Sequence, residues 1–404
     1  MLVMNNHEAS TDVAKTAIKA KGTPDFSKIA PNDTETDGLY MAEDDEGESY
    51  YYRGAVKNNY VSFAGFIWRI IRRNGDGSVR MIYSGKSTSD TGDAVTIGDS
   101  QFNSKYWDPT YVGYKYNEDF SLHESNGTTG YDWFTNTTKY NFGTGYTFDQ
   151  STKKFTLTGD IKQLTWNNNH DEIVNNQLYS CLETSCNVVY KIVGYNSATT
   201  MIVQPISYSS NSLLTAQTNT TDSPIKTKLD SWYKTNLTSY TSKLADETFC
   251  NDRSITSGSG YLTTPTTLYG AYTRLQDGKK PSLKCSQNND KFKMSNESAK
   301  LNYPVALITA DEVAMAGGRA YYNGSYSPNS NYYLYNGNYF WTLSPSRFNS
   351  YSSIANVWPV LPSGSLIPWY HVTYSIGVRP VINLKANTLI TKGDGSSLNP
   401  FVIS

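Results

Sequence analysis

Residues 60–83 carry the pattern that most restricts the fold of this chain. Apolar side chains alternate along 60–73, with Phe66, Trp68 and Ile70 on one face, and a second apolar run follows at 78–83. The residues between them read Asn-Gly-Asp-Gly, which is typical of a tight turn. Alternation of this kind indicates a strand with one buried face. The pattern therefore predicts a β-hairpin within an antiparallel sheet.

Two helices are predicted further along the chain. Ser223 followed by Pro224 is typical of a helix start, and apolar residues then recur at helical spacing. A capping-box pattern at 309–312 starts a second helix, which the glycines at 317–318 end. Residues 303–308 predict a buried strand before it. Few helices among many short, mainly antiparallel strands predict an α+β protein.

Composition excludes several classes of protein. Of 404 residues, 18% are charged and 14% are aromatic, the opposite of a disordered chain. A net charge of −1 gives no electrostatic attraction to nucleic acid. The longest apolar run, 61–71, is interrupted by Arg69 and is far shorter than the roughly 20 residues that span a bilayer. The first residues lack the pattern of a signal peptide. We expect an exported protein, secreted or at the cell surface, whose signal or anchor precedes this chain, so that the chain itself makes no membrane contact.

The cysteines favour an exported protein. There are four, Cys181, Cys186, Cys250 and Cys285, and three pairings are open to them. A bridge between the two nearest in sequence, Cys181 and Cys186, would leave Cys250 to pair with Cys285. A zinc site of four thiolates and four buried free thiols are the alternatives, although tight Cys-x-x-Cys spacings are absent. We expect disulfides.

Changes in composition divide the chain into segments. Residues 1–38 are polar and read as a lead-in to a domain over 39–404. Gly, Thr, Asn and Tyr dominate residues 86–220, which favours loops and short strands. We expect insertions into the domain at about 86–220 and at about 250–300. The acidic cluster at 43–48 lacks the ligand spacing of a calcium loop, so we interpret it as a solvated turn.

Residues 320–384 have an unusual composition. They contain ten Tyr and three Trp but no Lys, Asp, Glu, Gln, Met or Cys, and their only formal charges are Arg347 and Arg379. Burial in the core explains the lack of charges in stretches such as 341–344 and 377–384, but not in the whole segment. Low-complexity disorder conflicts with its aromatic content. Tyr, Ser, Asn and Gly with a few Trp and Arg are typical of antibody binding loops, where Tyr supplies broad contact area at low entropic cost. The composition therefore favours a recognition surface over a mixture of core and loops.

Motifs of known enzyme classes are absent. The four histidines, His7, His123, His170 and His371, stand in unrelated polar contexts. No Gly-x-Ser-x-Gly, His-Glu-x-x-His or phosphate-binding loop is present. Residues 320–384 offer no carboxylate or lysine as an acid, base or nucleophile. We expect no enzymatic activity, no cofactor and no metal.

A series of motifs from residue 38 onward resembles a family of uncharacterised surface proteins of gut Firmicutes. The motifs are Phe66-Ile-Trp-Arg-Ile-Ile71, Arg80-Met-Ile-Tyr83, Trp232-Tyr-Lys-Thr-Asn-Leu237, Phe249-Cys-Asn-Asp252, Ala306-Leu-Ile-Thr-Ala-Asp-Glu312, Phe340-Trp-Thr-Leu-Ser-Pro345 and Gly377-Val-Arg-Pro-Val-Ile-Asn-Leu384. That family is related to the C-type-lectin-like fold in the version shared with formylglycine-generating enzymes. The resemblance implies one compact domain with long loop insertions, its N- and C-terminal strands brought together, and often an N-terminal anchor.

The same fold carries the variable proteins of diversity-generating retroelements. The resemblance implies that adenine-directed mutagenesis rewrites codons near the C-terminus, and such codons cannot yield Lys, Glu, Gln, Met or Trp. The window 346–376 has none of the first four residues, and its Trp358 and Trp369 are then framework residues or lie outside the rewritten codons. Lectin-type calcium binding is not implied here, because 320–384 contain no acidic residue. The oxidase activity is not implied either, because no cysteine follows Cys285.

These observations predict a non-enzymatic, surface-displayed binding protein, adhesin-like or receptor-like, whose loops within 346–376 bind a protein or glycan on another surface. The expected contact residues are Arg347, Asn349, Tyr351, Ser353, Asn356, Pro359, Leu361, Ile367, Trp369, Tyr370, His371, Thr373 and Tyr374. Arg347, Trp369 and Tyr370 are the expected energetic anchors. We expect replacement of Tyr370 and Trp369 by Ala to abolish ligand capture and leave the melting temperature nearly unchanged, whereas Arg379 should hold the framework. Calcium-independent carbohydrate binding and a structural role in a pilus or surface layer are the alternatives.

Overall fold

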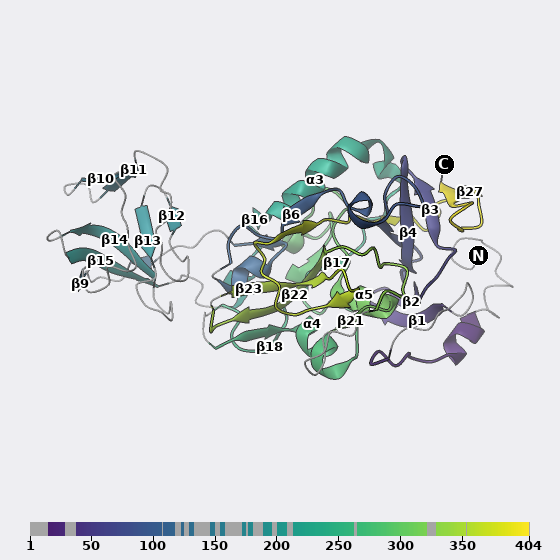
Figure 1. Cartoon of the computed structure of the whole chain (residues 1–404), viewed down its shortest axis with the longest axis horizontal. Coiled ribbons are helices and arrows are strands. Elements are labelled where there is room, and N and C mark those ends of the chain that lie inside the picture. Colours follow the sequence, from purple (N-terminus) through teal and green to yellow (C-terminus); the bar gives the residue numbers. More distant parts are fainter. Residues whose placement is uncertain are drawn as a thin grey trace.

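The computed structural model describes residues 15–28, 38–106, 108–117, 213–261, 265–320, 329–352 and 354–403, and the backbone of strands between 123 and 207. Strands in several sheets dominate these parts, and helices are few (Figure 1). The predicted α+β class is confirmed. The C-type-lectin-like fold remains a prediction.

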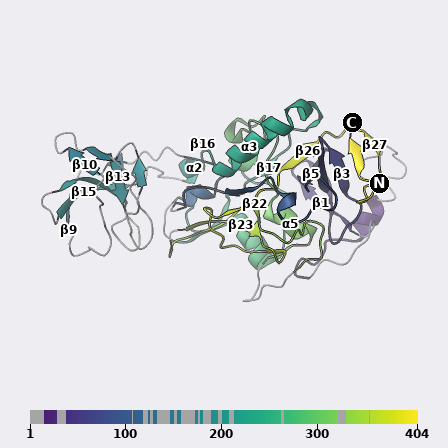
Figure 2. The ribbon, with the colours of Figure 1, turned by 45° about the horizontal axis from the view of Figure 1, so that its top comes forward.

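One sheet brings together strands from both ends of the domain. In the part of the chain that the structure describes, it has eight strands. They are β1 (Leu39–Asp44), β2 (Gly47–Tyr52), β3 (Tyr60–Phe63), β4 (Phe66–Arg73), β5 (Val79–Tyr83), β26 (Val381–Leu384), β27 (Ile390–Lys392) and β28 (Phe401–Ile403). Strand β28 pairs in parallel with β3, and β26 pairs antiparallel with β5, so early and late strands lie side by side (Figure 2).

The predicted hairpin is present, with one correction. Strands β4 and β5 pair antiparallel around the turn at 74–77, as expected. The run 60–73, however, is two strands and not one. It reverses at Ala64 and Gly65, whose φ angles of 55° and 79° lie in the left-handed region. The reversal buries Trp68 completely, and its Nε1 donates to the carbonyl oxygen of Phe63 at 3.1 Å.

The second large sheet carries the residues predicted for binding. Among the described residues it also has eight strands. They are β6 (Asp99–Gln101), β18 (Ile255–Ser257), β19 (Thr267–Tyr269), β21 (Arg319–Ala320), β22 (Phe340–Asn349), β23 (Ile354–Val360), β24 (Ser365–Leu366) and β25 (Ser375–Gly377). Two short antiparallel pairs join the main body, β7 (Lys115–Tyr116) with β16 (Thr221–Asp222) and β17 (Phe249–Cys250) with β20 (Lys291–Phe292). Here the main body means all described residues outside 118–212.

Both predicted helices are confirmed. Helix α3 (Pro224–Asn236) starts after Ser223, whose hydroxyl accepts a hydrogen bond from the backbone of Lys226. Helix α5 (Ala310–Ala316) has the full capping box, in which Thr309 and Glu312 each accept from the other's backbone N–H, and Gly317 ends it with φ of 125°. The remaining helical segments are residues 15–20, α2 (Leu213–Ala216), α4 (Gly270–Tyr272), the 3₁₀ turns η1 (Gly92–Val95), η2 (Pro109–Val112), η4 (Thr238–Lys243), η6 (Asn288–Asp290) and η7 (Glu297–Ala299), and the π-helical η5 (Thr273–Gly278).

The strand predicted at 303–308 is wrong in type but right in burial. Val305 to Ile308 are fully buried. A lone bridge joins Ala306 to Val381, in which Ala306 N donates to Val381 O at 3.2 Å and Val381 N to Ala306 O at 2.9 Å. Leu343 N of β22 also donates to Ile308 O at 2.8 Å, but these bonds form no ladder. Apolar composition thus marked a core segment that crosses the end of β26 without a continuous ladder.

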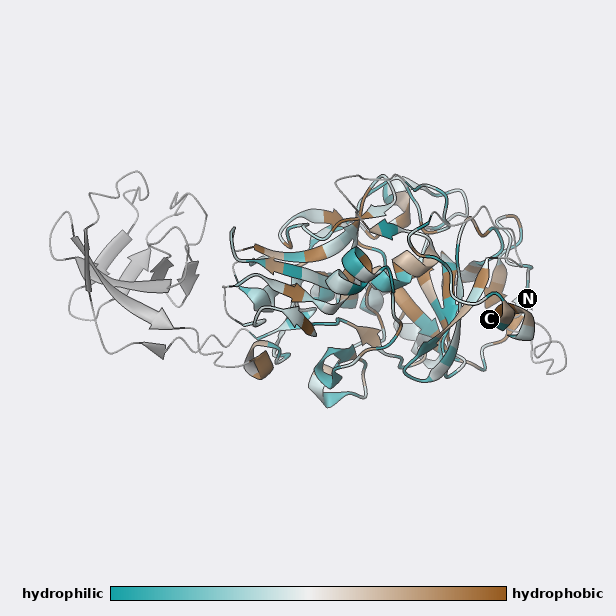
Figure 3. Ribbon diagram, turned by 90° about the horizontal axis from the view of Figure 1, so that it is seen from below, coloured by the Kyte–Doolittle hydropathy of each residue, from teal (hydrophilic) through white to brown (hydrophobic). Residues whose placement is uncertain are grey.

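The predicted boundaries of the insertions need correction. Phe102, Tyr111 and Tyr114 are fully buried in the main core, so residues 86–117 belong to the body. The same holds for the 250–300 region, where Tyr269 and Phe292 are core residues. In the lead-in, Ile18 also joins the core cluster and is 5% exposed. Figure 3 shows hydrophobic stretches along the strands of this body.

Strands between 123 and 207 form sheets of their own. They are β8 (His123–Glu124), β9 (Thr129–Asp132), β10 (Tyr146–Asp149), β11 (Lys154–Leu157), β12 (Glu172–Val174), β13 (Gln177–Ser180), β14 (Val189–Tyr195) and β15 (Thr200–Ser207). Among the described strands these pair only with one another, β10 with β11 and the others in one sheet. They lie at the left end of Figure 1, beside the main body.

Candidate functional site: an aromatic face beside the β22–β23 hairpin

The segment 370–374 gathers aromatic rings at one edge of the second sheet. The ring of Tyr370 stacks on Tyr339 at 5.6 Å between centroids and meets Trp341 and Tyr374 edge-on at 5.6 and 4.9 Å. Trp341 is fully buried, whereas Tyr374 is 52% exposed. The cluster therefore runs from the core to the surface, and each ring fixes its neighbour.

His371 continues the cluster toward strand β6. Its ring lies 4.5 Å from that of Tyr106 and 5.4 Å from that of Tyr374. Its Nδ1 lies 2.7 Å from the hydroxyl of Thr373. Burial lowers the pKa of His371 to about 4, so the ring is neutral at physiological pH. Burial, with Tyr339 and Tyr374 nearby, raises the pKa of Tyr370 to about 12, so its hydroxyl also stays neutral.

Backbone pairing on both sides holds this segment in place. Val357 N donates to the carbonyl oxygen of Tyr370 and Val372 N to that of Ala355, both at 3.2 Å. On the other side, Phe102 N donates to the carbonyl oxygen of Val372 at 2.9 Å. The aromatic face, defined as Tyr106, Tyr339, Tyr370, His371 and Tyr374, is thus carried on paired backbone.

Arg347 and the exposed tip are parts of the β22–β23 hairpin, whose strand β23 pairs with the 370–372 segment. Arg347 is half-buried, and its Nε donates to Oδ1 of Asn356 at 3.4 Å. Burial lowers its pKa, opposed by nearby Tyr272. At the hairpin tip, Asn349 Oδ1 accepts from the backbone N of Tyr351, whose side chain is 97% exposed. The tip therefore presents a Tyr ring fully to solvent.

Several predicted contact residues are part of the core. Asn356 is 3% exposed and Ile367 5% exposed, and Pro359 is also buried. Residues 354–360 were expected to be loop, but they form strand β23 between β22 and the 370–372 segment. Buried side chains offer no surface to a partner, so the contact role predicted for these three residues is wrong.

The other predicted residues have mixed positions. Leu361, Trp369 and Thr373 are half-buried. Tyr370 is half-buried too and packs against the main core, so we correct the expectation that its replacement would leave stability unchanged. Ser353 lies outside the described residues. Arg379 holds the framework as predicted, donating to the carbonyl oxygens of Tyr83 and Leu334 at 3.1 and 2.9 Å.

Two members of the face were missed from the sequence. Tyr339 stands within 320–384, and its place in that charge-free segment was the available signal. Tyr106 is distant in sequence, and it reaches the face because Ala355 N donates to its carbonyl oxygen at 2.7 Å. No local pattern around Tyr106 indicates that contact.

A charged cavity beside the disulfide is the other place where functional groups gather. Arg72 pairs with Asp44 at 2.6 Å and with Glu312 at 3.0 Å, and Arg80 pairs with Glu312 at 2.9 Å. Arg274 joins Asp252 and Asp311 at 2.7 and 2.8 Å in the same lining. The cavity holds about 30 Å³, enough for only one or two waters. Most of its charged side chains form ion pairs with one another, and its volume leaves no room for an organic ligand.

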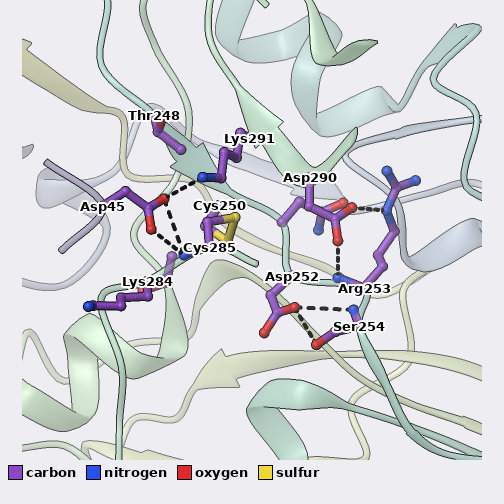
Figure 4. The surroundings of a disulfide bond; sticks show 12 residues. Asp45, Thr248, Cys250, Asp252, Arg253, Ser254, Lys284, Cys285, Asp290 and Lys291 are labelled. Atoms are coloured by element: carbon purple, nitrogen blue, oxygen red, sulfur yellow. Dashed lines mark hydrogen bonds and ion pairs between the residues drawn. A yellow bond between two sulfur atoms is a disulfide. The ribbon is translucent and has the colours of Figure 1, made fainter. Parts of the chain in front are cut away.

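The disulfide expected between Cys250 and Cys285 is confirmed, with a Cα–Cα distance of 5.7 Å. Figure 4 shows Asp45 beside it, 3.0 Å from Lys291 Nζ and accepting from the backbone N of Cys285 at 3.3 Å. The zinc and free-thiol alternatives are therefore excluded for this pair. Cys181 and Cys186 lie outside the described residues.

The acidic cluster at 43–48 forms the β1–β2 turn, but the prediction that it is merely solvated is wrong. Asp44 is 7% exposed and pairs with Arg72, and Asp45 pairs with Lys291. In the described parts of the chain, no three or more His, Cys, Asp or Glu side chains are grouped to hold a metal ion. None of the helices described is long and apolar enough to cross a membrane.

Comparison with known proteins identifies no relative of this chain. No protein-family model, no curated protein and no solved structure matches this chain. The resemblance to the surface-protein family therefore stands on the sequence motifs alone, and the function must be argued from the residues of the site.

Proposed function

We propose that this chain is a non-enzymatic, surface-displayed binding protein that contacts a protein partner on another surface through the aromatic face and the hairpin tip. The observation that carries the proposal is the exposure of Tyr374 and Tyr351, at 52% and 97%, on turns next to paired strands, where Tyr374 N donates to His371 O and Tyr351 N to Asn349 Oδ1. Tyr side chains are enriched at binding hot spots, and the ring of Tyr374 lies in a cluster of further aromatic rings.

The chemistry of the face supports recognition by contact area and hydrogen bonds. Tyr hydroxyls, the neutral ring of His371 and the half-buried guanidinium of Arg347 offer donors and acceptors around apolar rings. A rigid Tyr loses little conformational entropy on binding, as in antibody loops. The joining of N- and C-terminal strands in one sheet also agrees with what the family resemblance implies.

The proposal is tested by adding fluorescent full chain to a panel of bacterial and epithelial cells. We expect binding to at least one cell type, removed by protease treatment of the cells and unaffected by mild periodate oxidation of their glycans. Loss after periodate alone would instead support the carbohydrate-binding alternative. Concentration-dependent self-assembly in light scattering, without cell binding, would support a structural component of a pilus or surface layer.

We propose further that the window 346–376 is diversified by a retroelement, with variation limited by burial. Exposed Tyr351 and Tyr374 tolerate replacement, whereas Trp358 is fully buried. We expect the flanking DNA to hold a near-identical copy of these codons beside a reverse-transcriptase gene, differing mainly at adenines and sparing Trp358. Flanking DNA without such a copy rejects the diversification and leaves the binding proposal standing.

A further inference from the structure

A second hollow on the main body lies between strand β6 and helix α3. It is open to solvent and has a volume of about 550 Å³, within the range of ligand-binding sites. Asp99, Ser100 and Ser104 line one wall, and Thr227, Lys228 and Ser231 line the other. The three α3 residues lie on one side of the helix, because residues three and four apart are neighbours on a helix surface. We call this hollow the β6–α3 groove.

The two charges at the mouth of the groove differ from their neighbours. Lys226 is buried between Asp222 and Asp230 at 2.9 and 2.7 Å. The side-chain ammonium of Lys228 makes no hydrogen bond or ion pair with the described residues, and neither does the side-chain carboxylate of Asp99. The Lys228 ammonium reaches across toward β6, since a Cβ at Gly98 would lie 3.5 Å from its Nζ. The groove thus offers one unpaired ammonium and one unpaired carboxylate, while Asp222, which also lines it, is paired with Lys226 and Lys115.

The hydroxyl groups of the groove are arranged as acceptors. Thr227 Oγ1 donates to the carbonyl oxygen of Ser223 at 3.2 Å, and Ser231 Oγ to that of Thr227 at 2.9 Å. Ser100 Oγ donates to the carbonyl oxygen of Gln101 at 2.9 Å. Each of these three hydroxyls donates its hydrogen to a nearby backbone carbonyl, which leaves its lone pairs available to a ligand. With the Asp99 carboxylate, these oxygens need a ligand that donates several hydrogen bonds.

This set of groups selects among ligand classes. An anion such as phosphate would meet four acceptors and a single ammonium, so it is disfavoured. A peptide segment relies on apolar anchors, yet Tyr116 and Pro224 are the only lining residues with a largely apolar side chain, and Tyr116 is 4% exposed. A sugar chain carries many O–H donors without net charge, and its ring oxygens and hydroxyls also accept from Lys228. The groove is open to solvent, which leaves room for sugar units beyond the one that it contacts.

We infer that the β6–α3 groove binds a neutral oligosaccharide. Lys228 donates to sugar oxygens, while Asp99 and the side-chain hydroxyls accept from sugar O–H groups. The site is separate from the aromatic face: Gln101 of β6 donates to Thr373 O at 2.8 Å, which places β6 between the two. The inference does not depend on the proposed function, because it uses none of the face residues.

The test measures binding of the full chain to maltohexaose, cellohexaose, xylohexaose and N-acetylchitohexaose by titration calorimetry, with a sialylated hexasaccharide and a Gly/Ser/Lys peptide of equal length beside them. We expect one neutral hexasaccharide to bind, with affinity falling at least tenfold in Lys228→Ala and in Asp99→Asn. The matched control Lys234→Ala changes an exposed lysine of the same helix outside the groove and should leave the affinity unchanged.

The result that would overturn the inference is binding by none of the four neutral probes, tighter binding of the sialylated probe or the peptide, or neutral-sugar affinity that survives both groove substitutions. Melting temperatures within about a degree of wild type show that the variants fold. Tyr351→Ser with Tyr374→Ser should leave sugar affinity intact, so failure of the groove and failure of the aromatic face are separated.

Discussion

Replacing Glu312 with Gln should lower the free energy of unfolding by about 3–5 kcal/mol, the usual effect of breaking a buried ion pair by removing one partner. Both carboxylate oxygens of Glu312 are used. One accepts from Arg72 and Arg80 at 3.0 and 2.9 Å, and the other accepts from the backbone N of Thr309 at 2.9 Å. In Glu312→Gln, the amide NH₂ would replace one of these oxygens and would point its own hydrogens at N–H donors. The guanidiniums of Arg72 and Arg80 would also lose the carboxylate charge that both contact.

The substitution should also change the dependence of stability on pH. Burial by itself raises the pKa of Glu312, but Arg80 and Arg72 outweigh it and lower the pKa to about 2 from 4.5. A carboxylate with a depressed folded-state pKa stabilises the fold above its ordinary pKa and loses that contribution as pH falls toward 2. The free energy of unfolding of the wild type, measured by urea denaturation, should therefore fall between about pH 4.5 and 2. That of the Glu312→Gln variant should fall less over the same range.

Glu297→Gln is the matched control for this experiment. Glu297 forms an ion pair with Lys300 at 2.7 Å, but its side chain is 80% exposed. Exposed pairs contribute little, so the control should change the unfolding free energy by less than about 1 kcal/mol. A Glu312→Gln variant as stable as this control would show that the ion-pair cluster of Glu312, Arg72 and Arg80 does not hold the sheet and α5 together.

Replacing Cys250 and Cys285 with Ser should cost about 4 kcal/mol of unfolding free energy. The bridge closes a loop over a sequence separation of 35, and removing it restores the conformational freedom of that loop in the unfolded chain. The bridge also ties β17 to residue 285, whose backbone N donates to Asp45 in the β1–β2 turn. Without the bridge, this turn loses one link to β17. Equilibrium urea denaturation of the purified variant measures the change.

Two further measurements define this result. Mass spectrometry of the wild type after alkylation should show Cys250 and Cys285 bridged and unreactive. The single substitution Ala299→Gly within the same region changes packing without altering loop closure, and it should cost less than the loss of the bridge. An unchanged denaturation midpoint in the double Ser variant would contradict a stabilising role for the disulfide.

Local signals in the sequence predicted local structure well. The Asn-Gly-Asp-Gly turn, the Ser223 cap and the capping box of Thr309 with Glu312 each specify their element within a few residues. The turn at Ala64 and Gly65 was missed because Ala rarely adopts the left-handed conformation, and the apolar pattern runs straight across it.

Long-range contacts had no comparable signal. Glu312 and Arg72 are 240 residues apart, and nothing near either one indicates the other. Asn356 and Pro359 resemble loop residues, yet they lie in a buried strand because β22 and the 370–372 segment cover both of its edges. The composition of 320–384 located the aromatic face, but only the tertiary packing separates its exposed rings from its core rings.

The most direct test of the aromatic face is the amount of fluorescent full chain retained on cells that bind the wild type. We expect Tyr351→Ser with Tyr374→Ser to reduce retention at least about tenfold without a matching loss of melting temperature. The control Leu389→Ser alters another exposed apolar residue, 72% exposed and next to β27, and should leave retention unchanged. Retention of the double Tyr variant equal to that of the wild type would contradict the proposal that this face binds the partner.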